Sequence, residues 1–246
     1  MKTAAIILAA GAGTRMKSDK PKVAHEVLGK SLVNWVVDAA NEAGIDRIVT
    51  VVGHKREQVE PLVAGKSDIA VQVEQRGTAD AVLACKDALA DFDGSVLVLS
   101  GDSPLITAET MRALADLRAR ENAAVVVLTM HPADPFGYGR IIRDENDQVE
   151  RIVEQKDATP EEAAVGECNS GFYCFDAKAL FEALEQVGSD NAQGEFYLTD
   201  VLEISRRAGR PVLAMSAQDD TECLGINTPE QLAEIERIAR ERQAQG

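Results

Sequence analysis

The chain of 246 residues has the composition of an ordinary globular protein, with 45% hydrophobic and 27% charged residues. These fractions argue against disordered and fibrous proteins, and the apolar run at residues 4–10 is far shorter than the roughly 20 residues of a membrane span. Lys and Arg total 26 against 41 Asp and Glu, a formal charge of −15. Such a surface repels nucleic acid and anionic lipid, so we expect neither partner. An anionic ligand would need a local basic pocket.

The cysteines and histidines show no metal-binding spacing. No two of the four cysteines form a Cys-x-x-Cys pair, and the three histidines are scattered, so we expect no zinc site. The short N-terminal apolar run, followed at once by glycine and charge, does not resemble a secretory signal. We therefore expect reduced thiols in the core and a cytoplasmic location.

Apolar runs of strand length alternate with amphipathic segments in the first half of the chain. Strands are expected at residues 3–8, 48–52, 69–73, 96–99 and 125–130. Helices are expected from a cap at Ser31 to Gly44, and at residues 57–63, 78–89 and 107–120. This order predicts an α/β fold, with a Rossmann-like, mostly parallel sheet, right-handed crossovers and helices on both faces.

The alternation of strands and helices stops after His131, where prolines and glycines predict a loop. A hairpin is expected from strands at residues 140–142 and 149–153, with a turn at 144–147. The remaining expected elements are a strand at 169–175, a helix at 177–186, a polar loop at 188–195, a helix at 198–207, a strand at 212–215 and a helix from 228 onward. Since no Ser/Gly-rich linker occurs, we expect one compact domain with a small β-rich insertion over one end of the sheet.

A glycine-rich loop, Leu8-Ala9-Ala10-Gly11-Ala12-Gly13-Thr14-Arg15-Met16, follows the first strand. Glycines there let backbone N–H groups approach a phosphate closely. Positive charges gather in this loop at Arg15, Lys17, Lys20 and Lys22. The loop is therefore a candidate for the basic pocket that an acidic protein needs, and a tight turn with a solvated basic loop is the alternative.

Two other phosphate-binding motifs fit the sequence poorly. The Rossmann dinucleotide fingerprint requires a third glycine where Met16 stands. Gly29-Lys30-Ser31 looks like the end of a P-loop, but Ala24 occupies the position of its first glycine and no buried strand directly precedes it. We therefore interpret Gly29-Lys30-Ser31 as a helix cap.

Polar residues also follow the fourth and third strands. Asp102, in Ser100-Gly101-Asp102-Ser103-Pro104-Leu105, should face the same cleft as the glycine-rich loop, because parallel strands share their carboxyl edge. A carboxylate opposite a triphosphate suits Mg²⁺, whereas a simple turn is the alternative. The amide of Gln75 could bind the edge of a base, and Thr78 could do so too or be a plain N-cap.

Several later polar clusters lie at expected strand ends or in loops, where they suit hydrogen bonds to sugar hydroxyls or are merely solvated. They are Gly137-Tyr138-Gly139-Arg140, Glu154-Gln155-Lys156-Asp157, Asn169-Ser170-Gly171, the stretch 193–200 and Gly225-Ile226-Asn227.

Taken together, the order and spacing of these motifs from Ala5 to about Ala239 resemble the uridylyltransferase domain of bacterial bifunctional N-acetylglucosamine-1-phosphate uridylyltransferase/glucosamine-1-phosphate acetyltransferases. The glycine-rich loop alone marks the wider sugar-nucleotide transferase superfamily, and the later motifs are more specific. The resemblance implies a nucleotide-diphospho-sugar transferase fold. It also implies transfer of uridylyl from UTP to N-acetylglucosamine 1-phosphate, which supplies cell-wall (peptidoglycan) precursor synthesis.

The resemblance also implies roles for matching positions. The uridine nucleotide would contact Leu8, Ala9, Gly11, Gln75, Gly77 and Thr78. Arg15 and Lys22 would bind the phosphates as the catalytic cations, and Asp102 and Asn227 would ligate Mg²⁺. The amino sugar would contact Gly139, Glu154, Asn169, Tyr197 and Thr199.

The chain also departs from the family pattern. Ser100 replaces a frequent aromatic residue, Gln155 a His, Ser170 a Thr and Ala24 a bulkier apolar residue. The family's second domain is a β-helix of six-residue repeats, and no such repeat occurs in this sequence. We expect a uridylyltransferase domain at 1–227, a connecting helix at 228–246 and no acetyltransferase activity. The family's β-helix organises trimers, so without it a monomer and an oligomer both stay open for this chain. The alternatives are a nucleotidyltransferase for another nucleotide or sugar and a non-catalytic nucleotide-binding module.

Overall fold

The computed structural model describes residues 1–245, in which strands and helices alternate. The strands are β1 (Thr3–Ala9), β2 (Glu26–Val27), β3 (Lys30–Ser31), β4 (Arg47–Val52), β5 (Asp68–Val71), β6 (Ser95–Ser100), β7 (Val125–Met130), β8 (Arg140–Arg143), β9 (Val149–Val153), β10 (Cys168–Asp176) and β11 (Val212–Ser216). The helices are α1 (Leu32–Glu42), α2 (Arg56–Val63), α3 (Thr78–Leu83), α4 (Ala108–Glu121), α5 (Pro160–Ala163), α6 (Ala177–Leu184), α7 (Asp200–Arg207) and α8 (Pro229–Gln245). Short 3-10 turns are η1 (Thr14–Met16), η2 (Lys22–Ala24), η3 (Asp87–Leu89) and η4 (Asp220–Cys223).

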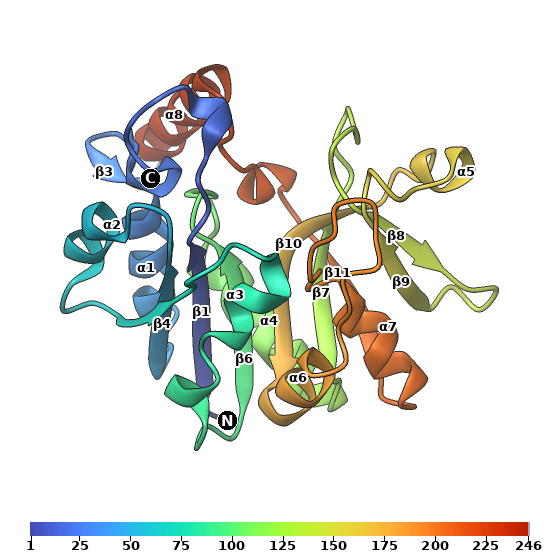
Figure 1. Cartoon of the computed structure of the whole chain (residues 1–246). Coiled ribbons are helices and arrows are strands. Elements are labelled where there is room, and N and C mark those ends of the chain that lie inside the picture. The colour runs from blue at the N-terminus through green and yellow to red at the C-terminus, as the bar shows by residue number, and fades with distance from the viewer. Residues whose placement is uncertain (246) are drawn as a thin grey trace.

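The main sheet has nine strands, with the central order β11-β7-β10-β6-β1-β4-β5. β10 runs antiparallel to β6 and β7, and the other neighbouring pairs in this order are parallel. The β8–β9 hairpin joins the sheet through β10 and lies beside α5 (Figure 1). The α/β, Rossmann-like, mostly parallel sheet and its β-rich insertion are therefore confirmed.

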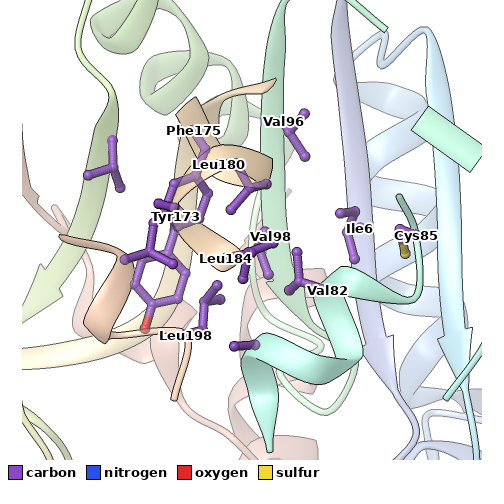
Figure 2. Close-up of a cluster of buried hydrophobic side chains, with 14 of the residues drawn as sticks. Ile6, Val82, Cys85, Val96, Val98, Tyr173, Phe175, Leu180, Leu184 and Leu198 are labelled. Carbon is purple, nitrogen blue, oxygen red and sulfur yellow. The ribbon is translucent and has the colours of Figure 1, made fainter. Parts of the chain in front are cut away.

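The two faces of the sheet carry separate apolar layers, because side chains alternate along each strand. Ala4 and Ile6 of β1 pack with α3, α6 and α7, whereas Ala5 and Ile7 pack with α1, α2 and α4. Figure 2 shows the first layer, in which Val82 of α3 and Leu180 of α6 approach the sheet. Each fully buried apolar side chain contributes roughly 1.5–3 kcal/mol, so both helical layers are firmly attached.

Helix α8 packs above the carboxyl ends of β1 and β6, where it forms a third apolar cluster (Figure 1). Ile235 and Ala239 of α8 are 2% and 5% exposed and lie in one cluster with Val27 and Leu105. The helix therefore covers the segments that follow β1 and β6, which are the segments expected to hold the ligand.

Ser31 occupies the N-cap position of α1, as the interpretation of Gly29-Lys30-Ser31 as a helix cap expects, but Gly29 and Lys30 belong to a β-hairpin. Leu28 and Gly29 have φ values of 53° and 77° and form the two-residue turn of the β2–β3 hairpin. Ser31 precedes α1, but its hydroxyl accepts a hydrogen bond from Asn34 Nδ2 at 2.9 Å and caps no backbone N–H. The β2–β3 hairpin therefore leads directly into the cap position of α1, and no side-chain bond completes the cap.

Two other helical expectations are corrected. The helix expected at 78–89 ends at Leu83, because i→i+3 hydrogen bonds such as Cys85 N to Val82 O take over and lead into η3. Helix α5 was not expected, although Thr159 and Glu162 form the capping box that begins it. Within residues 1–245, no helix combines the length and apolar character needed to cross a membrane.

Candidate active site

A pocket of about 310 Å³ lies where β1, β5 and β6 end. All residues expected to contact the nucleotide line it, namely Leu8, Ala9, Gly11, Gln75, Gly77 and Thr78. After that expectation we call it the nucleotide pocket. Lys22 and Asp102 line the same pocket. The shared carboxyl edge of the parallel strands thus brings the three expected segments together, and the volume is that of a small-molecule site.

Gly13 allows the glycine-rich loop to pack against Lys22. Its φ is 60°, and a Cβ at this position would lie 2.5 Å from Lys22 Cβ. A larger residue would push Lys22 away and would be strained in this left-handed conformation. The position of the Lys22 side chain therefore depends on Gly13.

The four residues expected to handle phosphate and metal form one connected cluster. Lys22 Nζ forms an ion pair with Asp102 Oδ2 and donates a hydrogen bond to Asn227 Oδ1 at 3.0 Å. Arg15 Nη2 donates to the same oxygen of Asn227 at 2.8 Å. Three chain segments, the loop after β1, the loop after β6 and the segment before α8, therefore meet at this point.

The oxygen atoms in this cluster suit a divalent cation. The Asp102 carboxylate and the Asn227 amide oxygen both contact one positive centre, the Lys22 ammonium, so they converge as metal ligands must. Mg²⁺ commonly takes one or two protein oxygens together with phosphate oxygens and water. Residues 1–245 contain no group of three or more His, Cys, Asp and Glu side chains placed to bind a metal.

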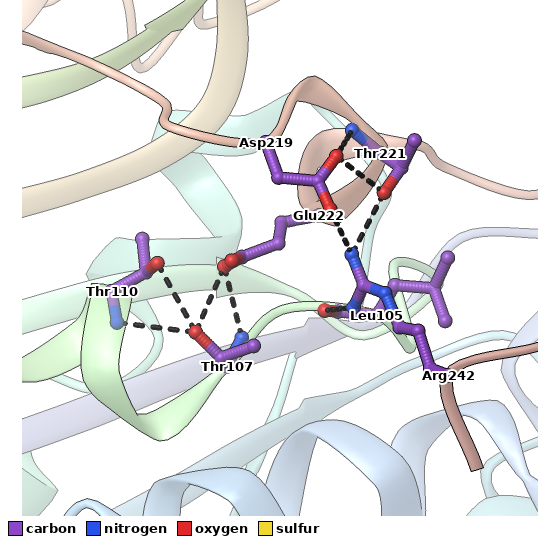
Figure 3. A network of polar contacts seen from close by, with 7 residues as sticks. All are labelled: Leu105, Thr107, Thr110, Asp219, Thr221, Glu222 and Arg242. Carbon is purple, nitrogen blue, oxygen red and sulfur yellow. Dashed lines mark hydrogen bonds and ion pairs between the residues drawn. The ribbon is translucent and has the colours of Figure 1, made fainter. Parts of the chain in front are cut away.

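A polar network fixes the segments that carry Asp102 and Asn227 (Figure 3). Arg242 of α8 donates to Leu105 O at 2.8 Å and to Asp219 Oδ2 at 2.8 Å. Glu222 Oε2 accepts from the backbone N and the hydroxyl of Thr107, at 3.2 and 3.0 Å. These contacts connect the segment after Asp102 to the segment before Asn227, and this link explains how two distant oxygens are kept together.

The residues expected to contact the amino sugar lie in a second group. Thr199 Oγ1 donates to Glu154 Oε1 at 3.2 Å, and Asn169 N donates to Gly139 O at 2.9 Å. A Cβ at Gly139 would lie 3.5 Å from both Glu154 Oε2 and Asn169 Cβ, so the two pairs adjoin. Tyr197 is 7% exposed, and its hydroxyl contacts Asp157 Oδ2 at 3.2 Å rather than any of these four residues.

Gly77 joins this second group to the nucleotide pocket. Its φ is 126°, and a Cβ would lie 2.4 Å from Phe196 O, so the chain at 195–198 packs directly on the Gly77 backbone. Thr78 Oγ1 accepts a hydrogen bond from Leu198 N at 2.9 Å. Thr78 is therefore not a plain N-cap, because Gly77 occupies the cap position and the Thr78 hydroxyl bonds another segment.

The second group of residues is acidic and partly desolvated. Burial raises the pKa of Glu154, and the Thr199 hydroxyl opposes this, while Asp157, Asp200 and Glu195 raise it further. Burial, followed by Glu203 and Asp157, raises the pKa of Asp200 to about 6. Burial raises the pKa of Tyr197 to about 12. These groups suit hydrogen bonds to neutral hydroxyl and amide groups better than contact with an anion.

Sequence reasoning missed Gln72, which is 5% exposed and lines the nucleotide pocket. The expected strand at 69–73 included it, but β5 ends at Val71. The signal that could have found it is a polar residue at the carboxyl end of an apolar strand, where a side chain faces the ligand edge. Gln75, in contrast, is exposed although it lines the same pocket.

Two residues that depart from the family pattern, Ser100 and Gln155, lie beside the residues expected to bind the substrates. Ser100 lines the nucleotide pocket, and its hydroxyl lies 3.2 Å from where a Cβ of Gly171 would be. Gln155 Oε1 accepts hydrogen bonds from Gly137 N at 3.1 Å and Arg140 Nη2 at 2.9 Å. Gln155 thus holds the loop before Gly139, beside the residues expected to contact the sugar.

Comparison with known proteins places this geometry in a family. A family model described as nucleotidyl transferase matches residues 4–225. The chain is 54% identical over 237 residues to bifunctional protein GlmU of Lactobacillus gasseri, covering 96% of this chain and 51% of that protein. It is 50% identical over 242 residues to bifunctional protein GlmU of a Geobacillus species, covering 98% and 53%. The family resemblance is confirmed, and the chain spans about half the length of the curated relatives it matches.

Two solved structures share the fold. UDP-glucose pyrophosphorylase complexed with UDP-glucose matches with a TM-score of 0.74 at 18% identity, over 98% of this chain and 100% of the other. A candidate glucose-1-phosphate thymidylyltransferase from Bacillus anthracis, in complex with sucrose, matches with a TM-score of 0.77 at 20% identity, over 97% and 95%. These matches confirm the expected nucleotide-diphospho-sugar transferase fold.

Proposed function

The chain belongs to the nucleotidyl transferase family, and on that premise we propose that it transfers uridylyl from UTP to N-acetylglucosamine 1-phosphate. The products are UDP-N-acetylglucosamine and pyrophosphate, and the reaction supplies cell-wall precursors. Identity of 50–54% to bifunctional GlmU proteins supports this choice of reaction within the family. We place the reaction in the cytoplasm, where reduced thiols fit the four buried, unbonded cysteines.

The observation that carries the proposal is the contact of Lys22 with both Asp102 and Asn227 at the mouth of the nucleotide pocket. Arg15 adds a second positive charge at Asn227. In a protein with a formal charge of −15, this is the local basic site that two phosphate esters require. A nucleotide in the pocket would contact Leu8, Ala9, Gly11, Gln75, Gly77 and Thr78, with Gln72 as an addition from the structure.

Catalysis in this proposal is positioning and charge neutralisation. The phosphate of the sugar attacks the α-phosphorus of UTP in line, and because that phosphate is already an anion, no general base is needed. Arg15 and Lys22 neutralise the charge that develops on the α-phosphate and on the leaving pyrophosphate. Asp102 and Asn227 would hold a divalent cation, proposed as Mg²⁺, which would supply further positive charge to offset that of the phosphates.

Movement of Lys22 is part of the proposal. Its ammonium is paired with Asp102, so a triphosphate would compete with the carboxylate for it. A Lys22 ammonium bound to phosphate would leave the Asp102 oxygens available to hold a divalent cation.

The amino sugar is proposed to bind Gly139, Glu154, Asn169, Tyr197 and Thr199. Support comes from the Glu154–Thr199 hydrogen bond and from the adjoining Gly139 and Asn169 backbones. A site that pairs polar groups with an N-acetyl group disfavours a ligand without it, because buried partners lose their hydrogen bonds. We therefore expect N-acetylglucosamine 1-phosphate to react faster than glucose 1-phosphate.

A pyrophosphate-release assay tests the function. The purified chain is given UTP, CTP, GTP or dTTP with N-acetylglucosamine 1-phosphate, glucose 1-phosphate or no sugar, with Mg²⁺ or with a chelator. The proposal predicts release with UTP, N-acetylglucosamine 1-phosphate and Mg²⁺ together. Faster release with another nucleotide or sugar indicates a related transferase, and nucleotide binding without release in any combination indicates a binding module; either result contradicts the proposal.

A further inference from the structure

The amide group of Gln72 is held in the wall of the nucleotide pocket by two hydrogen bonds. Its Nε2 donates to Gly77 O at 3.0 Å and to Asp80 Oδ2 at 2.9 Å. A primary amide nitrogen carries two protons, so both donors are used. The one polar atom of the side chain that is left for a ligand is Oε1, to which no donor in residues 1–245 is hydrogen-bonded.

Asp80 and the Gly77 carbonyl together determine this orientation, since both can only accept hydrogen bonds. A carboxylate only accepts hydrogen bonds, so the nitrogen end of the amide must face it. The other carboxylate oxygen, Oδ1, accepts from Arg76 Nη2 at 2.6 Å and from Arg76 Nε at 3.2 Å. The Asp80 side chain is only 12% exposed, and the Arg76 contact fixes it from the solvent side.

We propose that Asp80 is a positioning residue for base selection, because it makes Gln72 present an acceptor to the nucleobase. Uracil offers a ring N3–H donor to such an acceptor, whereas the corresponding N3 of cytosine has no hydrogen and is itself an acceptor. A Gln72 amide with the reverse orientation would favour cytosine. The inference rests on the proposed function, since it requires the base to lie in this pocket.

The test compares the dissociation constants of UTP and CTP, measured by calorimetry, for the wild type and Asp80→Asn. The substituted side chain keeps one acceptor for Arg76 and turns an N–H toward Gln72. That N–H attracts the oxygen end of the Gln72 amide and competes with Gly77 O, which still attracts the nitrogen end, so the amide is no longer held in one orientation. We expect the preference for UTP over CTP to fall about tenfold, the equivalent of one hydrogen bond. If the role of Asp80 were purely structural, the substitution would weaken the binding of both nucleotides equally and leave the preference for UTP over CTP unchanged.

Glu74→Gln is the matched control, because Glu74 also lies beside Arg76, at 3.8 Å, but does not contact Gln72. It should keep the wild-type ratio. Arg76→Gln, at a side chain that is 56% exposed, is the second variant if Asp80→Asn does not fold, and it should lower the ratio in the same direction by a smaller factor.

If folded Asp80→Asn keeps the wild-type preference for UTP over CTP, the inference is overturned while the proposed function stands. The same holds for Arg76→Gln where that variant replaces Asp80→Asn. An equal fall in the Glu74→Gln control also overturns it, because general charge near Arg76 would then explain the effect. If the wild type binds neither nucleotide, the proposed function fails and the inference fails with it.

Discussion

The ammonium group of Lys22 lies against the carboxylate of Asp102 and also contacts Asn227 Oδ1 at 3.0 Å. Lys22 follows β1, Asp102 follows β6 and Asn227 precedes α8, so the contact exists only because the fold brings these segments together. The Lys22 and Asp102 side chains are 18% and 16% exposed, and an ion pair so sheltered is screened less by salt than a surface pair. We take this contact as the centre of the proposed chemistry.

Replacement of Asp102 by Ala should lower the rate of pyrophosphate release by about 10²–10³, because it removes the charged oxygen ligand proposed for the cation. The measurement is steady-state turnover at saturating UTP and sugar phosphate, with folding checked by circular dichroism. Asp116→Ala, on the exposed side of α4, is the control and should retain full activity. Turnover near the wild-type value in Asp102→Ala would contradict the assigned role.

Lys22→Ala should also reduce turnover by about 10²–10³, since it removes a charge proposed to neutralise the phosphates. Lys17→Ala is the matched control, because Lys17 is an exposed lysine of the same loop and neither Asp102 nor Asn227 contacts it. If both lysine variants lose the same modest activity, general positive charge near the loop explains the effect and Lys22 has no special role.

The sugar contacts predict a separate effect. Glu154→Gln should lower kcat/KM for N-acetylglucosamine 1-phosphate by roughly 10–100-fold, because a hydrogen bond to a charged group contributes about 1.5–3 kcal/mol. The KM for UTP should change little, since Glu154 does not line the nucleotide pocket. Glu150→Gln on β9 is the control. If only the KM for UTP changed, Glu154 would act on UTP binding and not on the sugar phosphate, against the prediction.

The raised pKa of Asp200 predicts a pH-dependent stability. Burial raises the pKa of Asp200 from an ordinary value of 3.8 to about 6 in the folded chain, so its contribution to stability is fully present below about pH 3.8 and is lost as the pH rises through 6. Asp200→Asn should therefore stabilise the protein at pH 7–8, by the order of 1 kcal/mol because partial exposure weakens the effect, and give no gain near pH 3.8. Urea unfolding at both pH values measures this, and an equal gain at both would disprove the titration.

The anchoring of α8 can be tested at Arg242, whose side chain donates to Leu105 O, Asp219 Oδ2 and Thr221 Oγ1 (Figure 3). Arg242→Ala should lower the free energy of unfolding by roughly 1–3 kcal/mol. It should also weaken Mn²⁺ binding in the presence of UTP, because Asn227 lies two residues before the helix that Arg242 anchors. Arg240→Ala, an exposed residue of the same helix, is the control. Unchanged Mn²⁺ affinity would show that the network does not position Asn227.

Much of the fold follows from local patterns in the sequence. The apolar runs that became β1, β4, β6 and β7 are long, buried on both faces and separated by amphipathic helices, so their periodicity specifies both type and order. The β2–β3 hairpin was not predictable in this way, because two-residue strands carry no periodicity and Leu28 is not a typical residue for a positive φ.

The candidate site likewise contains residues that local sequence patterns could predict and residues that they could not. Asp102 and the glycine-rich loop could be placed from strand ends alone, because the carboxyl edge of a parallel sheet collects them. Asn227, Glu154 and Thr199 were placed through family resemblance, and their contacts depend on distant segments whose packing no local pattern describes. Gln72 was missed since it was counted as an interior strand residue, and the bond from its amide to Asp80 appears only in three dimensions.

The most direct test of the central claim is a crystal structure of the chain with UDP-N-acetylglucosamine and Mg²⁺. The account predicts the diphosphate within hydrogen-bond distance of Arg15 and Lys22, with a metal ion held by Asp102 and Asn227. A diphosphate bound elsewhere, or bound in this pocket with Lys22 still paired to Asp102 and no metal on these oxygens, would contradict it.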